Sequence, residues 1–239
     1  MNIKTIGSGS EGNCYLVKGS NHSSLLLDAG ISFKEMQKAI KFKTSTIRGV
    51  LVTHCHLDHA GYVKEYMNNG LEIYMTQGTK DALQLPDDYR LHVIDIMETF
   101  MIDDFKVMAF DTIHDAKEPC GFVVGFEDKK LLYATDTMYL KYKIPNLTHI
   151  MLEANYEYDL LQERIESGEI VQSLGNRIMK THMSLDTAIK YLNSIDKSKL
   201  ETIIMIHLSK NNAKQNRFKE RLQAETGKII KLATQMEEF

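Results

Sequence analysis

The sequence is short of cysteine and proline, and both shortages limit the kind of protein it can encode. Its 239 residues include three cysteines, Cys14, Cys55 and Cys120, an odd number at irregular spacing. Such spacing fits neither a disulfide framework nor a zinc knuckle, so we interpret all three as reduced thiols. With three prolines and no low-complexity run, the chain has little room for a proline-rich linker between domains.

Long apolar runs and an excess of either charge are also missing. No N-terminal segment has the pattern of a signal peptide, and no apolar run is long enough to span a bilayer. We therefore expect a cytoplasmic protein with no membrane partner. The formal net charge of −3 gives no overall cationic field for nucleic acid, so any site for a polyanion must be a local patch.

The composition is that of a globular protein, with 43% hydrophobic and 26% charged residues. Short strand patterns come first, and helical patterns are interleaved with strands in both halves of the sequence. No internal repeat interrupts this order. We predict a single α/β domain over residues 1–239, built from two packed sheets covered by helices.

Metal-capable side chains crowd into the stretch THCHLDHAG at residues 53–61. It follows the apolar run IRGVLV, which has the pattern of a buried strand, and precedes GYVKEYMNN, which has the pattern of a helix. The cluster should therefore lie on a strand-to-helix loop, where functional residues of α/β sheets collect. Its candidate ligands are His54, His56, Asp58 and His59. Cys55 is interpreted as a bystander.

The spacing of these residues serves two metal ions, because His54 and His56 can face one ion and Asp58 and His59 a second. Four ligands are too few for two ions, so other strand ends should supply more. His114, Asp136 and His207 each end an apolar strand pattern. We predict His54, His56 and His114 on one ion and Asp58, His59 and His207 on the other, with Asp136 shared.

Five segments, LLLDAG, THCHLDHAG, IHDAKEP, YATDT and IMIHLSK, resemble in order the five motifs of the metallo-β-lactamase fold. The resemblance implies an αβ/βα sandwich of two mixed sheets flanked by helices, with Asp28 beneath the metal loop. Only 70 residues lie between Asp136 and His207, too few for an inserted β-CASP domain. Lactamase-type members usually carry cysteine in place of Asp136, which argues against β-lactam hydrolysis.

Four further segments, GSGSEGN, LEANYE, THMSLDTA and HLSKNN, resemble the YycJ (WalJ) group of exonucleases. This resemblance implies a phosphodiesterase, and within that class a DNA exonuclease, that uses two divalent ions, Zn²⁺ or Mn²⁺, to activate a hydroxide. His182 of THMSLDTA would lie over the scissile phosphate and protonate the leaving oxygen. Glu153 of LEANYE would hold His182, and Asp58 would orient the attacking hydroxide.

Three other functions stay open at this point. The chain could act on a small phosphodiester such as a cyclic nucleotide or an oligonucleotide, which the modest net charge favours. It could be a thioesterase of the glyoxalase II type, a group that shares the aspartate but has no use for His182. It could also be a metal-binding regulatory module without turnover. The sequence does not indicate an oligomeric state.

Two segments have both a structural and a functional interpretation. GSGSEGN is either a simple turn or a loop that presents backbone N–H groups to a phosphate. The basic run that begins three residues after His207 is either a solvated helix face or a phosphate-binding edge. It contains Lys210, Lys214, Arg217, Lys219 and Arg221.

Overall fold

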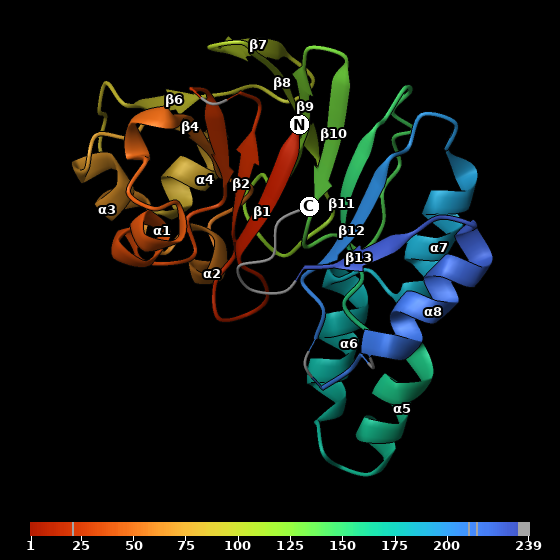
Figure 1. The fold of residues 1–239 in the computed structure, drawn as a ribbon. Coiled ribbons are helices and arrows are strands. Elements are labelled where there is room, and N and C mark those ends of the chain that lie inside the picture. Colours follow the sequence, from red (N-terminus) through yellow and green to blue (C-terminus); the bar gives the residue numbers. More distant parts are fainter. Residues whose placement is uncertain (21, 210, 214, 234–239) are drawn as a thin grey trace. The chain divides into compact units, whose positions relative to one another are not determined.

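The computed structural model describes residues 1–20, 22–209, 211–213 and 215–233 (Figure 1). Within these residues the chain divides into two compact units, each of which is described by itself. The first unit holds residues 1–111, 116–130 and 233, and the second holds residues 112–115 and 131–232. The short segment 112–115 therefore belongs to the second unit, although its neighbours in the sequence belong to the first.

A mixed six-stranded sheet opens the first unit. Neighbouring strands follow the order of the sequence: β1 (Asn2–Gly7), β2 (Cys14–Lys18), β3 (Ser24–Leu27), β4 (Ile47–Leu51), β5 (Ile73–Met75) and β6 (Leu91–Val93). The first three strands are antiparallel, and the pairs from β3 to β6 are parallel. Because β3 and β4 are parallel, the residues that follow them emerge at the same edge of the sheet.

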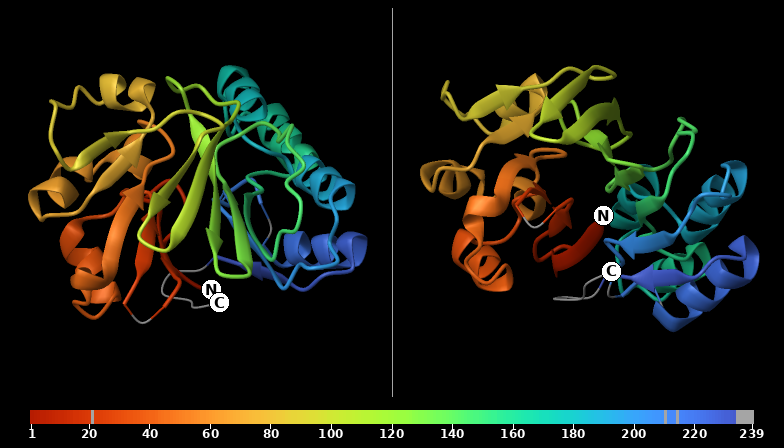
Figure 2. Two further views of the ribbon diagram at one scale, coloured as in Figure 1. Left: turned by 90° about the horizontal axis from the view of Figure 1, so that it is seen from above. Right: turned by 45° about the horizontal axis from the view of Figure 1, so that its top comes forward.

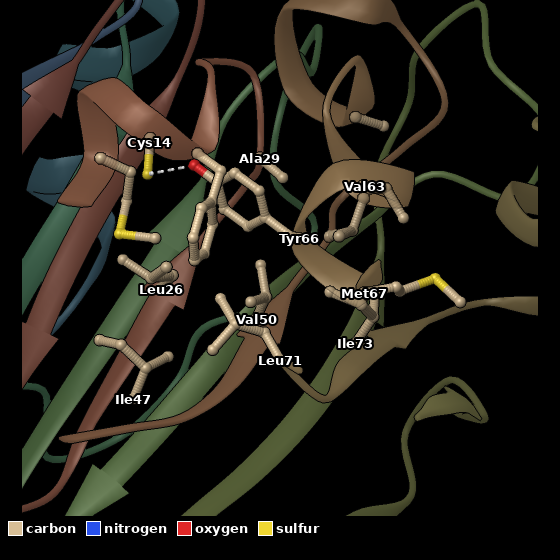
Figure 3. Close-up of a cluster of buried hydrophobic side chains, with 14 of the residues drawn as sticks. Cys14, Leu26, Ala29, Ile47, Val50, Val63, Tyr66, Met67, Leu71 and Ile73 are labelled. Carbon is tan, nitrogen blue, oxygen red and sulfur yellow. Dashed lines mark hydrogen bonds between the residues drawn. The ribbon is translucent and has the colours of Figure 1, made fainter. Parts of the chain in front are cut away.

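Helices pack on this sheet and bury its apolar face. They are α1 (Phe33–Ala39), α2 (Leu57–Ala60), α3 (Val63–Asn68) and α4 (Gln77–Ala82), with a 3₁₀ turn, η1 (Thr44–Thr46). The helix α1 begins after Ser32, whose Oγ accepts a hydrogen bond from the Glu35 N–H at 3.3 Å, as the sequence predicts. Tyr66 of α3 lies among the buried side chains of Leu26, Val50 and Ile73 (Figure 3). This packing fixes the helix that follows the metal-capable loop.

Three antiparallel strands complete the first unit: β7 (Thr99–Ile102), β8 (Phe105–Asp111) and β9 (Cys120–Phe126). Ile102 pairs with Phe105, so Asp103 and Asp104 form the two-residue hairpin turn that the sequence predicts. Asp103 has a φ of 51°, in the left-handed region that such a turn requires.

The second unit is built on parallel strands. β10 (Lys129–Ala134) begins in the first unit and continues in the second, where β11 (His149–Glu153), β12 (Thr202–Ile206) and β13 (Ile230–Leu232) follow. Every residue of β11 is buried, which is typical of a parallel strand covered on both faces. The carboxyl ends of β10, β11 and β12 therefore lie side by side.

Four helices accompany these strands: α5 (Tyr158–Glu166), α6 (Gln172–Thr181), α7 (Leu185–Ser194) and α8 (Gln215–Thr226). The helix α7 begins after Ser184, whose Oγ accepts a hydrogen bond from the Thr187 N–H at 3.2 Å, again as predicted. Figure 2 shows α7 and α8 beside each other, with α8 next to β13.

The strands belong to two mixed sheets, ordered β1-β2-β3-β4-β5-β6 and β13-β12-β11-β10-β9-β8-β7, with helices flanking them. The predicted α/β class with two mixed sheets is confirmed. The interpretation of residues 1–239 as one domain stays a prediction. Within the described part of the chain, no helix combines the length and the hydropathy needed to cross a membrane.

Candidate metal and phosphodiester site

The metal-capable loop follows β4 in the first unit and runs into a one-turn helix. His54 lies in the loop, His56 directly precedes α2, and Asp58 and His59 lie within α2. The ring of His54 is 4.7 Å from that of His56 and 4.3 Å from that of His59, measured between centroids. The predicted loop thus contains a short helix, and the structure brings three of its four candidate ligands together around His54.

Asp28, the residue after β3, lies under this loop and is fully buried. One carboxylate oxygen accepts hydrogen bonds from the Thr53 N–H at 2.8 Å and from the Thr53 hydroxyl at 2.9 Å. The other accepts a hydrogen bond from His59 Nδ1 at 2.7 Å. A proton held on Nδ1 leaves the lone pair of His59 on Nε2, the arrangement found in metal-binding histidines.

The GSGSEGN loop is tied to the metal-capable loop through its last residue, Asn13. The backbone N–H of Asn13 donates to the Asp58 carbonyl at 2.7 Å, and its side-chain oxygen accepts from the Gly9 N–H at 2.9 Å. Its side-chain nitrogen lies 3.0 Å from His59 Nε2. The GSGSEGN loop is therefore hydrogen-bonded to the metal-capable loop, and Asn13 holds the first turn of α2 in place.

Gly30 sits where these segments meet and leaves no room for a side chain. A Cβ at this position would lie 1.8 Å from the Asp58 carbonyl oxygen and 2.6 Å from the Asn13 nitrogen. We expect Gly30→Ala to lower the free energy of unfolding by about 1–3 kcal/mol, because backbone must move to accommodate the methyl group. Thermal unfolding followed by circular dichroism measures this loss.

Gly125→Ala is the matched control for that substitution. Its Cβ would meet nothing closer than the Lys106 carbonyl oxygen at 3.6 Å, an ordinary contact distance. The control should keep the wild-type midpoint of thermal unfolding. A Gly30→Ala midpoint equal to that of the control would show that the loops are not packed as described.

The other predicted ligands collect in the second unit. His114 lies three residues after β8, Asp136 two residues after β10, and His207 directly after β12. One Asp136 carboxylate oxygen is 3.4 Å from His114 Nε2, and the other is 3.3 Å from His207 Nδ1. Asp136 therefore faces two different histidines, as a shared ligand would.

His114 is held in a defined orientation by its second ring nitrogen. Nδ1 donates to the Thr181 carbonyl at 2.8 Å, so that the lone pair of the neutral ring is on Nε2. Burial lowers the pKa of His114, and this effect outweighs the attraction of Asp136. The ring is thus neutral near pH 7, which is the form that binds a metal ion.

Glu153, at the end of β11, is fully buried and pairs with His182. One carboxylate oxygen lies 2.5 Å from His182 Nδ1, and the other accepts from the backbone N–H groups of Thr137 at 2.9 Å and Met183 at 3.3 Å. The sequence allowed Glu153 to be either a buried partner of His182 or a solvated strand end, and the structure shows the first. His182 stacks on His207 with ring centroids 5.5 Å apart.

The charges of this pair stabilise each other. Burial alone would lower the pKa of His182, but the Glu153 carboxylate outweighs it and raises the pKa above the usual value. Burial alone would raise the pKa of Glu153, but the charge and hydrogen bond of His182, together with a hydrogen bond from His207, outweigh it and the pKa is lowered. Both shifts favour the charged forms of the two groups, a Glu153 carboxylate and a His182 imidazolium.

Backbone strain marks three of the residues around these groups. Asp28, Asp136 and His207 have φ angles of 62°, 42° and 52°, in the left-handed region that side chains other than glycine rarely adopt. Each follows within two residues of a strand end. The sharp turn directs each side chain away from the path of its strand, and strain of this kind is concentrated at functional sites.

The basic run after His207 does not present free guanidinium groups where the structure describes it. Lys210 and Lys214 lie outside the described residues. Arg217 pairs with Glu157 at 3.0 Å, and Arg221 pairs with Asp186 at 2.5 Å and Glu225 at 3.0 Å. Arg217 thus pairs with a buried carboxylate and Arg221 with two carboxylates, which favours the solvated helix face over a phosphate-binding edge.

Sequence reasoning gave no role to two asparagines, Asn13 and Asn155. Asn155 donates to the His207 carbonyl at 3.1 Å and lies 3.3 Å from His207 Nδ1. Both asparagines are part of segments that carry the resemblance, GSGSEGN and LEANYE, so the signal was present. What the letters alone do not show is which histidine each amide faces.

The sequence of the chain matches a known protein family. The family described as "Beta-lactamase superfamily domain" matches residues 24–208. The chain is similar to the exodeoxyribonuclease YycJ of Bacillus anthracis, with 26% identity over 227 residues that cover 89% of this chain and 84% of the relative.

Two solved structures have the same fold as this chain. The metallo-β-lactamase fold protein YhfI from Bacillus subtilis has a TM-score of 0.76 at 16% identity, covering 100% of this chain and 98% of its own. Zn²⁺-bound PqqB from Methylobacterium extorquens has a TM-score of 0.74 at 16% identity, covering 100% and 99%. The chain therefore belongs to the β-lactamase superfamily and is a metal-dependent hydrolase with the metallo-β-lactamase fold.

Proposed function

We propose that this protein is a phosphodiesterase with two divalent metal ions, and that its substrate is DNA, which it degrades from an end. The observation that carries the proposal is the His182–Glu153 pair. Its two members lie in one cluster with Asp136 and His207, in which one ligand atom from each residue is within 4.8 Å of the others. An imidazole held by a buried carboxylate beside predicted metal ligands suits a reaction whose leaving oxygen needs a proton.

The residues present fit the metals that the proposal requires. The Nδ1 atoms of His59 and His114 donate to Asp28 and to the Thr181 carbonyl, so each neutral ring carries its lone pair on Nε2, the atom that would bind a metal ion. Imidazole and carboxylate are the ligand types that Zn²⁺ and Mn²⁺ accept. In the proposed set, His54, His56 and His114 hold one ion, Asp58, His59 and His207 the other, and Asp136 both.

The chain's own residues supply the remaining chemistry. Bound divalent cations would neutralise charge on the phosphoryl group and make water a better nucleophile. Asp58 would orient the attacking water. His182 would donate its proton to the leaving oxygen while Glu153 holds the ring in place, a contribution of about 10²–10⁴ in rate for a general acid.

The similarity to an exodeoxyribonuclease supports DNA as the substrate, and zinc bound to PqqB supports Zn²⁺ as one candidate ion. The match of one family to residues 24–208, which include parts of both units, supports their function as one domain. A cytoplasmic location fits the three free cysteines. Burial raises the pKa of Cys14 to about 12, so that side chain stays a thiol, with no thiolate to bind metal.

Turnover of bis-p-nitrophenyl phosphate by protein loaded with Zn²⁺ or Mn²⁺ tests the reaction class. We expect release of p-nitrophenolate that a chelator abolishes, and slow or no cleavage of a thioester such as S-lactoylglutathione. Thioester cleavage without phosphodiester cleavage would favour the glyoxalase II type instead. Metal uptake without turnover of either compound would favour a regulatory module.

A further inference from the structure

One face of α6 carries hydrogen-bond donors along most of its length. Ser173, Asn176, Arg177 and Lys180 are spaced by three, one and three residues, which places them on the same side of the helix. These four side chains, called the α6 stripe below, line a pocket of about 580 Å³. His114 and Asp115 form part of the same wall. The pocket therefore extends from a predicted metal ligand along the helix.

Contacts within the second unit attach the α6 stripe to His114. Thr181, the last residue of α6, accepts the hydrogen bond from His114 Nδ1 at 2.8 Å. Arg177 Nε pairs with Asp115 at 2.7 Å, and the other Asp115 oxygen lies 3.4 Å from His114 Nε2. A long ligand with one group bound at His114 could therefore extend along the pocket beside α6.

The chemistry of the α6 stripe suits phosphate oxygens. It offers a hydroxyl, an amide, a guanidinium and an ammonium group. Among the residues that line the pocket, Asp115 has the single carboxylate. An exposed ion pair such as Arg177–Asp115 contributes only about 0–1 kcal/mol, so a phosphate can replace the carboxylate. No carboxylate of the described residues forms an ion pair with Lys180, whereas Arg217 and Arg221 are paired on α8.

The length of the α6 stripe favours a strand over a single nucleotide. Ser173 and Lys180 are seven positions apart, which is about 10 Å of helix. In a B-form duplex each strand carries a phosphate about every 3.4 Å along the helix axis, so the stripe is roughly as long as a three-nucleotide stretch of one such strand. One cyclic mononucleotide would leave most of these donors without a partner.

We propose that the α6 stripe binds the backbone phosphates of a nucleic-acid strand beside the scissile bond. The proposal rests on the phosphodiesterase function above and adds where a polymeric substrate would be bound. Backbone contacts of this kind position the strand without reading its sequence. Arg177 and Lys180 are positioning residues in this account, since the reacting atoms would lie near the proposed metal ligands and His182.

The test is the double variant Arg177→Gln, Lys180→Gln in the metal-loaded protein. Its affinity for a fluorescently labelled single-stranded DNA with uncleavable phosphorothioate linkages is measured by anisotropy over a salt series. We expect a loss of about tenfold per contact and a log–log salt slope smaller by about 1.4 units, for two phosphate contacts on a single strand. An RNA of the same sequence should show the same losses, because both backbones carry the same phosphates.

The double variant Arg217→Gln, Arg221→Gln is the matched control, since it removes the same charge from the same unit. It should bind DNA like wild type and hydrolyse bis-p-nitrophenyl phosphate at the wild-type rate. Wild-type DNA affinity and slope in the α6 variant would overturn the proposal, as would equal losses in the control. If the wild-type protein does not hydrolyse bis-p-nitrophenyl phosphate but the α6 variant still loses DNA affinity, the proposed function is contradicted and the binding role of the α6 stripe is supported.

Discussion

His182→Ala should lose about 10²–10⁴ in turnover of a DNA phosphodiester while keeping both metals and the fold. The loss is expected because His182 is paired with the buried Glu153 and its pKa is raised, so that a proton is ready for the leaving oxygen. The loss should be much smaller on bis-p-nitrophenyl phosphate, because p-nitrophenolate departs without a proton. The measurement is the ratio of the two losses, with metal content determined on the same preparation.

Two comparisons make this experiment specific. His22→Ala, at an exposed histidine, should leave both rates unchanged. Glu153→Gln keeps a hydrogen-bonding side chain but removes the charge that holds the proton on His182, and should lose part of the same activity. Equal losses on both substrates would indicate phosphate binding by His182. No loss on either would remove the case for a phosphodiesterase and favour the thioesterase.

Asp136→Ala should lose most of the bound metal and nearly all turnover. The reason is that the two carboxylate oxygens of Asp136 face two different histidines, His114 and His207, within one buried group. Removing a shared ligand would weaken the binding of both ions at once, whereas removing a histidine would weaken the binding of one. Elemental analysis should fall from about two equivalents of transition metal per chain to well below one.

Asp159→Ala is the control for that variant, because Asp159 is an exposed carboxylate on α5 of the same unit. It should retain metal and activity at the wild-type level. Full metal retention in Asp136→Ala would disprove its assignment as the shared ligand, even if turnover were lost.

Much of this arrangement could be predicted because it is set by local sequence. Ser32 and Ser184 cap helices where the pattern places them, and the turn at Asp103 and Asp104 joins β7 to β8. His114, Asp136 and His207 follow apolar runs that form buried strands. Hydrophobic periodicity and capping chemistry carry that information over a few residues.

Other features depend on contacts between distant segments, which periodicity does not record. The segment 112–115 belongs to the second unit because the Ile113 N–H donates to the Thr137 hydroxyl at 3.0 Å and the Ile113 carbonyl accepts from the Met138 N–H at 3.0 Å. The pairing of Arg217 with Glu157 joins residues 60 positions apart and changes the interpretation of the basic run. The three-residue strand β6 is too short to give a pattern.

The most direct test of the central claim uses end-labelled single- and double-stranded DNA and RNA with protein loaded with Mn²⁺ or Zn²⁺. The account predicts that DNA is shortened progressively from an end, that a chelator stops the reaction, and that Asp136→Ala is inactive. DNA that stays intact while a cyclic nucleotide or another small phosphodiester is hydrolysed under the same conditions would contradict the account.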